Sequence, residues 1–165
     1  MLGDTEPERD CVHCLLVASR VGSNVLFERF YKLRGETTTD SERTTWRRAF
    51  HAASSPTLGS AVEEEPYVAN HRSHTIVWTT LGGLVLFIAG SGIYDELSLA
   101  EILRSVVGLL KTTTKSKAPT EMLFQANLGK FCLTADELLY AGHVEMLDKD
   151  AISRHVKLKT AKEKA

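Results

Sequence analysis

The sequence lacks a surplus of charge of either sign. Its 20 Lys and Arg residues nearly balance its 21 Asp and Glu residues, so the formal net charge is −1 at pH 7. Such a balance creates no long-range field that would draw the chain onto nucleic acid or anionic lipid. We therefore expect no nucleic-acid partner and only peripheral contact with membranes, through local surfaces.

Cysteines and secretion signals are also scarce. The chain has three cysteines, an odd number that argues against a disulfide framework. The opening residues MLGDTEPERD lack the basic flank and apolar core of a signal peptide, and no Asn-x-Ser/Thr glycosylation acceptor is present. These absences predict a cytoplasmic protein.

Metal and thiol chemistry find little support in the tetrapeptide Cys11-Val-His-Cys14. A structural zinc site usually has four ligands in two close pairs, but Cys132 stands alone and the pair His71 and His74 lies far outside finger spacing. On a strand, residues three apart point to opposite faces, so Cys11 and Cys14 should diverge. We predict no metal, with Cys14 filling core volume; a metal or thiol enzyme is the competing hypothesis.

No pattern for catalysis or cofactor binding stands out either. The stretch Gly90-Ser-Gly92 lacks the third glycine and the Lys-Ser/Thr pair of phosphate-binding loops. No motif places a nucleophile beside a base and an oxyanion donor. We predict that the protein is not an enzyme and needs no cofactor.

The longest uncharged run, residues 75–94, has the length of a membrane-spanning helix. Its centre is Leu81-Gly82-Gly83, with strand-type residues on both sides. Glycine costs stability inside helices and strands but suits a tight turn. We therefore favour two buried strands joined by a glycine turn, and keep a membrane span as the alternative.

Further strands are predicted at residues 11–18, 25–33 and 67–70, where short runs are apolar or alternate in polarity. Three pairs have capping-box spacing and should each begin a helix: Thr39 with Glu42, Ser98 with Glu101, and Thr134 with Glu137. The second of these helices has the widest apolar stripe. Together these elements predict an α+β domain without the regular alternation of a doubly wound sheet.

Polar segments separate these elements and end the chain. Ser54–Pro66 and Lys111–Pro119 read as solvated loops, and a last helix is predicted from Asp148 through Ile152 and Val156. We assign residues 1–10 to a flexible N-terminus, 11–157 to one domain and 158–165 to a polar tail.

Two stretches of the sequence, one in each half, carry a recognisable pattern. The C-terminal half contains Phe131, Asp136, Glu137, Gly142 and Val144, and the N-terminal half contains SRVGSNVLFERFYKL with the aromatic-Tyr pair Phe30 and Tyr31. In these residues the chain resembles the small chains of clathrin-adaptor and coatomer complexes, whose first hairpin has a second strand that ends in such a pair. The resemblance covers roughly residues 10–157 and implies a longin (SNARE-like) fold, a five-stranded antiparallel sheet flanked by helices in the order β-β-α-β-β-β-α-α.

Among these families, the best fit is the longin-like small subunit of plant TPLATE (TSET) complexes. That resemblance implies a noncatalytic subunit of a vesicle-coat adaptor that acts in clathrin-mediated endocytosis at the plasma membrane. Its implied partners are a large solenoid (adaptin-like) chain and a medium chain, with the clathrin machinery contacted indirectly. The alternative is a longin subunit of a tethering complex such as TRAPP.

The sigma chains of adaptors bind acidic dileucine peptides in an apolar pocket beside a basic residue on the second strand. The positions that match this pocket are Leu84, Val107, Met122 and Phe124. Core packing also explains these apolar residues, and it is the preferred interpretation because they lie on the apolar stripes that should be buried. Because Val25 or Leu26 replaces the basic residue, the glutamate of a cargo peptide would lack a charged partner.

We expect core and subunit interface to share residues, since an assembly subunit leaves apolar side chains for its partner to cover. The candidates are Phe27, Phe30 and Tyr31 on the second strand and the helix segment 103–110.

Overall fold

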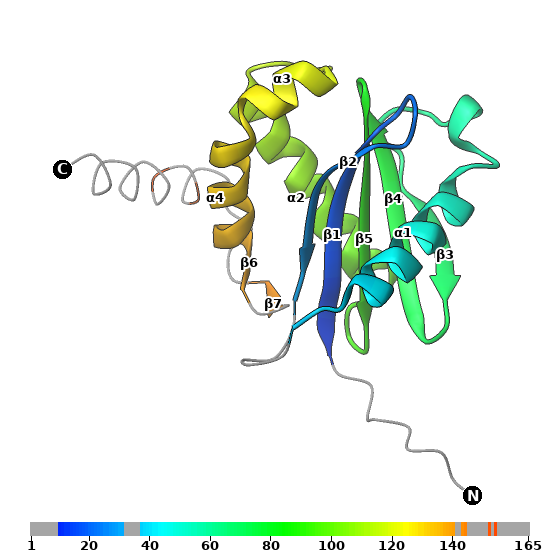
Figure 1. Ribbon diagram of the computed structural model, residues 1–165. Coiled ribbons are helices and arrows are strands. Elements are labelled where there is room, and N and C mark those ends of the chain that lie inside the picture. The colour runs from blue at the N-terminus through cyan, green and yellow to red at the C-terminus, as the bar shows by residue number, and fades with distance from the viewer. Residues whose placement is uncertain (1–9, 32–36, 141–142, 145–151, 153, 155–165) are drawn as a thin grey trace, which may run out of the picture.

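A computed structural model describes residues 10–31, 37–140, 143–144, 152 and 154. In these residues, an antiparallel five-stranded sheet of order β2-β1-β5-β4-β3 is covered by helices on both faces (Figure 1). Helix α1 lies on one face, and α2 lies on the other with α3 and α4 beside it. The α+β class and the order from β1 to α2 are those predicted, whereas the third helix after β5 and the hairpin β6–β7 were not predicted.

The strands confirm the interpretation of the uncharged run. Their bounds are β1 Cys11–Ser19, β2 Val25–Phe30, β3 Tyr67–His71, β4 His74–Leu81 and β5 Leu84–Ser91. Strands β4 and β5 pair with each other around the Gly82-Gly83 turn. Among the described residues, no helix is both long enough and apolar enough to cross a bilayer.

The helices cover the sheet and lead to a short second hairpin. Their bounds are α1 Asp40–Ser54, the 3-10 helix η1 Leu58–Ser60, α2 Glu96–Thr114, α3 Glu121–Ala126 and α4 Leu128–Leu138. Strands β6 Leu139–Tyr140 and β7 His143–Val144 form a two-stranded sheet. The 3-10 helix η1 lies within the segment 54–66, for which the sequence predicts a loop.

Two predicted helix boundaries need correction in α2. The N-cap is Asp95, whose carboxylate accepts the Ser98 backbone N–H at 3.0 Å, so the helix begins before Ser98. It also continues through residues 111–114, predicted as loop, because Thr113 and Thr114 are buried. The Thr114 hydroxyl donates to the Leu110 carbonyl at 2.7 Å, which allows a polar side chain to sit there.

The third capping box is wrong, whereas the first is confirmed. Thr39 accepts the Glu42 backbone N–H at 3.2 Å, but Thr134 lies inside α4, where its hydroxyl donates to the Phe131 carbonyl at 2.7 Å. A threonine hydroxyl can donate to a carbonyl of the preceding turn as well as cap a helix. The spacing of Thr and Glu alone therefore does not distinguish a helix start from a helix interior.

The ends of the predicted elements differ elsewhere. Strand β2 stops at Phe30, short of Leu33, which lies outside the described residues. Gly142 of the family pattern, the predicted flexible N-terminus up to residue 9 and the predicted tail from residue 158 also lie outside them. The same holds for most of the predicted last helix, although Ile152 is described and fully buried.

The sheet buries side chains on both faces, which creates two cores. On β1, Leu15 and Val17 join the core under α2, whereas Leu16 and Ala18 join the core under α1. This alternation follows from the two-residue period of a strand. Burial on both faces also explains the long apolar runs of β1 and β5, and the buried threonines of β4.

Candidate binding site on the α1 face

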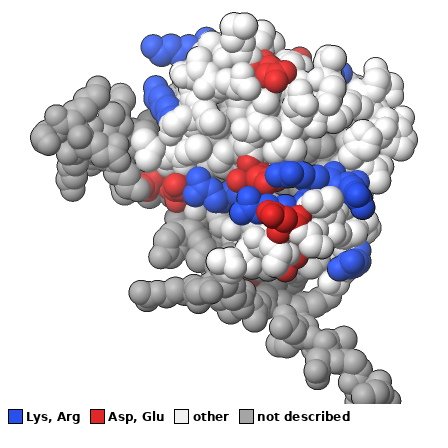
Figure 2. Space-filling model, in the orientation of Figure 1, with Lys and Arg blue, Asp and Glu red and all other residues white. Residues whose placement is uncertain are grey.

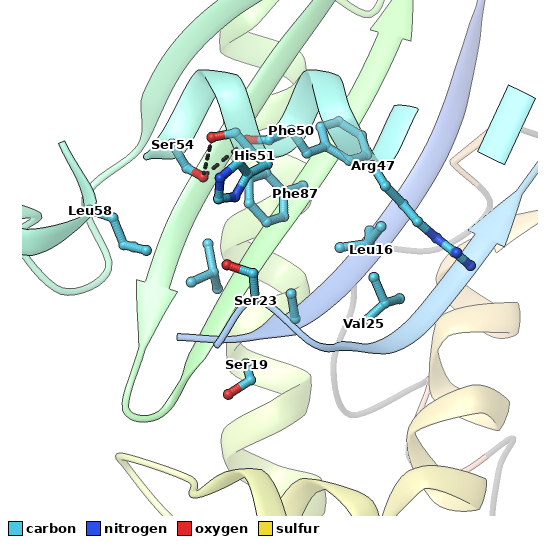
Figure 3. Close-up of a pocket in the computed structure, with 12 residues that line it drawn as sticks. Leu16, Ser19, Ser23, Val25, Arg47, Phe50, His51, Ser54, Leu58 and Phe87 are labelled. Carbon is cyan, nitrogen blue, oxygen red and sulfur yellow. Dashed lines mark hydrogen bonds between the residues drawn. The ribbon is translucent and has the colours of Figure 1, made fainter. Parts of the chain in front are cut away.

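A pocket opens between the C-terminal half of α1 and the β1–β2 hairpin (Figure 3). The buried side chains Leu16, Phe50 and Phe87 line it, and the ring of Phe50 stacks on that of Phe87 with centroids 5.0 Å apart. Val25 from β2 and Leu58 from η1 complete its apolar wall. These residues come together because α1 packs its apolar stripe on the sheet while the hairpin extends beyond it.

Three polar side chains around the pocket, those of Ser19, Arg47 and Ser54, have partners within the chain. The Ser54 hydroxyl donates to the Phe50 carbonyl at 3.0 Å, as Figure 3 shows, and the Ser19 hydroxyl donates to the Val21 carbonyl at 2.7 Å. Arg47 Nε donates to Glu28 Oε2 at 2.8 Å. The pocket therefore offers mainly apolar contact and has no activated nucleophile among its lining residues.

An ion-pair cluster borders this site. Glu28 on β2 contacts both Arg47 and Arg43, the latter at 3.7 Å, and its side chain is only 11% exposed. The hydrogen bond from Arg47 to Glu28 is the main cause that raises the pKa of the Arg47 guanidinium above its ordinary value. On the opposite face of β2, Arg29 binds Asp136 of α4 at 3.0 Å.

Charged side chains form a band across the face shown in Figure 2. Above the band, the surface in this view carries few charges. The pocket combines its apolar wall with the charged Arg47 among its lining residues. With a volume of about 60 Å³, it is far below the roughly 300 Å³ or more of cofactor sites. It suits one apolar side chain.

The residues predicted for a cargo-peptide pocket do not surround this cavity. Leu84 and Phe124 are fully buried in the α2-side core, and Met122 is 80% exposed on α3. Val107 lines a separate small hollow beside Thr79 and Arg104, between α2 and β4. Cargo binding at these positions stays a prediction, and core packing accounts for Leu84 and Phe124.

The residues of the family pattern hold α4 against the sheet. The Phe131 ring contacts that of Phe27 at 5.0 Å and that of Phe124 at 5.2 Å. Asp136 forms the ion pair with Arg29, and the Val144 backbone N–H donates to the Tyr94 hydroxyl at 3.1 Å.

Several other predicted residues also pack within the domain. Glu137 is half-buried on α4, and Phe30 and Tyr31 pack against the α1-side and α2-side cores respectively. The candidate interface residues Phe27 and Leu103–Leu110 are mostly buried, so in this chain alone they belong to the core.

The Cys11–Cys14 segment is a structural part of the sheet. Cys14 is fully buried, and burial raises the pKa of its thiol well above the ordinary value. A bulge between Val12 and Cys14 interrupts the alternation of side chains, so the argument that Cys11 and Cys14 must face apart does not hold across it. His13 covers the sheet beside Trp46, with ring centroids 4.7 Å apart.

No group of three or more His, Cys, Asp or Glu side chains is placed to hold a metal in the part of the chain that the structure describes. The Gly90–Gly92 stretch forms the turn from β5 to α2, where the Asp10 carboxylate accepts the Ile93 backbone N–H at 2.9 Å.

Sequence reasoning missed the pocket on the α1 face. Its residues come from β1, β2, α1, η1 and β5, which are distant in the chain. Part of the pocket could have been found from the spacing on α1. There the polar residues Arg47 and His51 each follow an apolar residue of the stripe, Trp46 and Phe50, and so lie at the border of that stripe.

Comparisons with known proteins show what the chain is similar to. No protein-family model matches it. It is 26% identical over 148 residues to the TSET complex member tstD of Dictyostelium discoideum, and this alignment covers 90% of this chain and 93% of that protein. Its fold matches a chain in a homology model of the full-length AP-3 complex, with a TM-score of 0.62, 15% identity and coverage of 93% and 96% of the two chains. The chain therefore shares the fold of that AP-3 chain and is similar in sequence, over most of its length, to a TSET complex member.

Proposed function

We propose that this chain is the noncatalytic small subunit of a TPLATE/TSET-like coat adaptor that acts in clathrin-mediated endocytosis and membrane trafficking. The observation that carries the proposal is the similarity to a TSET complex member over 90% of the chain. The adaptor-like fold supports it, as does the match of both halves of the sequence to small-chain patterns.

The partners in this proposal are a large solenoid chain and a medium chain of one complex, which would hold the protein at the plasma membrane peripherally. The pocket on the α1 face would receive an apolar side chain of the large chain. Its apolar lining supports this role.

Affinity purification of the tagged full-length chain from cells that express it natively, followed by mass spectrometry, tests the assignment. We expect a large solenoid chain and a medium chain in stoichiometric amounts. Recovery of several small longin-like tethering subunits instead would favour the TRAPP-type alternative. Recovery of the chain alone would contradict both.

A matched pair of variants tests the role of the pocket. Val25→Asp places a charge beside the pocket, where Val25 is 36% exposed, and Val21→Asp places the same charge near the hairpin tip, where Val21 is 84% exposed. Desolvating an unpaired carboxylate is costly, so we expect Val25→Asp to reduce co-purified large chain about tenfold or more. Val21→Asp should change it little, and equal effects of both variants would exclude the pocket as the contact.

A further inference from the structure

The turn between β1 and β2 borders the pocket on the α1 face and contains a strained residue, Ser23. Gly22 and Ser23 both have left-handed backbones, with φ of +86° and +55°. The Ser19 N–H donates to the Asn24 carbonyl at 2.8 Å and closes the turn. A left-handed backbone suits glycine and is costly for serine. An outlier of this kind at the mouth of a pocket points to a function for its side chain.

The Ser23 hydroxyl is accessible. Three serines line the pocket, and two of them, Ser19 and Ser54, are buried and donate to carbonyls of the chain. Ser23 is exposed, and its hydroxyl has no hydrogen-bond partner among the described residues. The turn itself is held in place, because the Arg20 N–H donates to the Gly83 carbonyl at 2.8 Å. Of the serines that line this pocket, Ser23 is therefore the one that another enzyme can reach.

Basic side chains lie beside this serine, and the lining of the pocket has no acidic one. Arg47 and His51, one turn apart on α1, lie across the pocket from Ser23, as Figure 3 shows. The acid that borders the pocket, Glu28, is already engaged by Arg43 and Arg47. A guanidinium group and an imidazole both donate hydrogen bonds to phosphate, and those that involve charged groups are strong. The mouth of the pocket therefore suits a phosphate group on Ser23.

We propose that Ser23 is a phosphorylation site, and that its phosphate closes the pocket on the α1 face to the large chain. The donor is ATP, bound to a protein kinase. A bond forms between Ser23 Oγ and the γ-phosphorus, the bond from that phosphorus to the β,γ-bridging oxygen breaks, ADP leaves, and the hydroxyl proton passes to the base of the kinase. Kinases select substrates partly by charge patterns, and Arg20 stands three residues before this serine.

The phosphate changes what the mouth of the pocket can bind. It adds a charge of about −1.5 to −2 at neutral pH. An apolar side chain that enters the pocket would have to strip water from this group, which is costly. The inference rests on the proposed function, in which the large chain occupies the pocket. The kinase acts on the free chain, before the large chain covers Ser23, so the modification controls assembly.

Phosphopeptide mass spectrometry of the native chain, from cells treated with a phosphatase inhibitor, tests whether the site is used. Trypsin cleaves after Arg20 and Arg29 and releases the peptide VGSNVLFER, whose only hydroxyl group is that of Ser23. We expect the phosphorylated peptide in the free chain and not in the chain that co-purifies with the complex. Its absence from both pools, or equal amounts in both, would overturn the proposal.

Phosphorus NMR tests whether the phosphate is held at the pocket. The full-length chain is prepared with phosphoserine at position 23, and the second pKa of the phosphate is measured in the folded chain and in urea. Neighbouring cations favour the dianion, so we expect folding to lower this pKa by about 0.5 unit or more, and His51→Gln to remove part of the shift. A pKa that folding leaves unchanged, or a shift that His51→Gln leaves intact, would contradict the proposed contact.

Capture of the large chain separates this proposal from the proposed function. Phosphoserine at position 23 should reduce captured large chain about tenfold or more, and phosphatase treatment should restore it. Phosphoserine at position 73 is the matched control, because Ser73 lies in the exposed β3–β4 turn and does not line the pocket. Equal capture by the modified and unmodified chains would overturn the proposal. Failure of the unmodified chain to capture any large chain would overturn the proposed function, whereas the NMR shift would still place the phosphate at the pocket.

Discussion

At the scale of single residues, Gly82 shows how one position joins two parts of the fold. It has a φ of +58°, and a Cβ atom there would lie 2.6 Å from the Ala118 carbonyl carbon and from the Pro119 oxygen. The neighbouring Gly83 N–H donates to that Pro119 oxygen at 3.0 Å. The glycine turn predicted from sequence is therefore also a docking point for the segment between α2 and α3.

Replacing Gly82 by alanine should destabilise the protein by about 2–4 kcal/mol, because a left-handed backbone and a backbone clash coincide. Gly129 provides the control, since it lies in α4 with open space around its would-be Cβ. Gly129→Ala should stabilise by about 0.5–1 kcal/mol through helix propensity. Urea unfolding of both variants measures the difference, and effects of the same sign would contradict this account.

At the scale of elements, β2 is tied to helices on both faces through neighbouring residues. Glu28 points toward α1 and Arg29 toward α4, as strand alternation requires. The two ion pairs differ in exposure: Glu28 is 11% exposed, whereas Arg29 and Asp136 are 39% and 44% exposed. Solvent and salt therefore screen the second pair much more strongly.

Glu28→Gln should accordingly cost about 1–3 kcal/mol, since it removes the charge from a largely buried acceptor shared by two arginines. Asp136→Asn should cost less than about 1 kcal/mol. Thermal unfolding at low and at high salt compares the two variants. A larger loss for Asp136→Asn would show that exposure is not what separates them.

Element types were easier to predict than their ends. The apolar stripe of α2 and the glycine turn between β4 and β5 are local patterns, and both elements were predicted correctly. The start of α4 was missed because Thr134 has capping-box spacing, yet its hydroxyl bonds to the preceding turn. A residue whose side chain can either cap a helix or hydrogen-bond to the preceding turn does not mark a helix boundary by sequence alone.

At the scale of the whole molecule, the inner strand β1 lies between two cores, and Cys14 belongs to the core on the α1 side. Its thiol is fully buried, and burial raises its pKa, so in the folded state it stays protonated at neutral pH. The related stability is complete below the ordinary thiol pKa, and is lost as the pH rises from there through the higher folded-state pKa.

Iodoacetamide should therefore modify Cys14 only when the whole sheet unfolds. Cys11 and Cys132 are partly exposed and serve as internal references in the same sample. Mass spectrometry of peptides after timed labelling separates the three sites. Gly82→Ala should speed labelling of Cys14 by the factor by which it raises the unfolded fraction, about tenfold for each 1.4 kcal/mol of lost stability. Labelling of Cys14 as fast as that of Cys132 would show that β1 opens locally.

The sequence by itself determined the α+β class, the buried hairpin and the family resemblance, because periodicity, glycine turns and residue order are local properties of the chain. Tertiary structure alone decided that Leu84 and Phe124 are core residues, that β3 lies at an edge of the five-stranded sheet, and that β1, α1 and η1 meet around a pocket. These outcomes depend on which distant segments pack together. The spacing of an apolar residue predicts that it is buried, but only packing decides whether it lies in the core or lines a pocket.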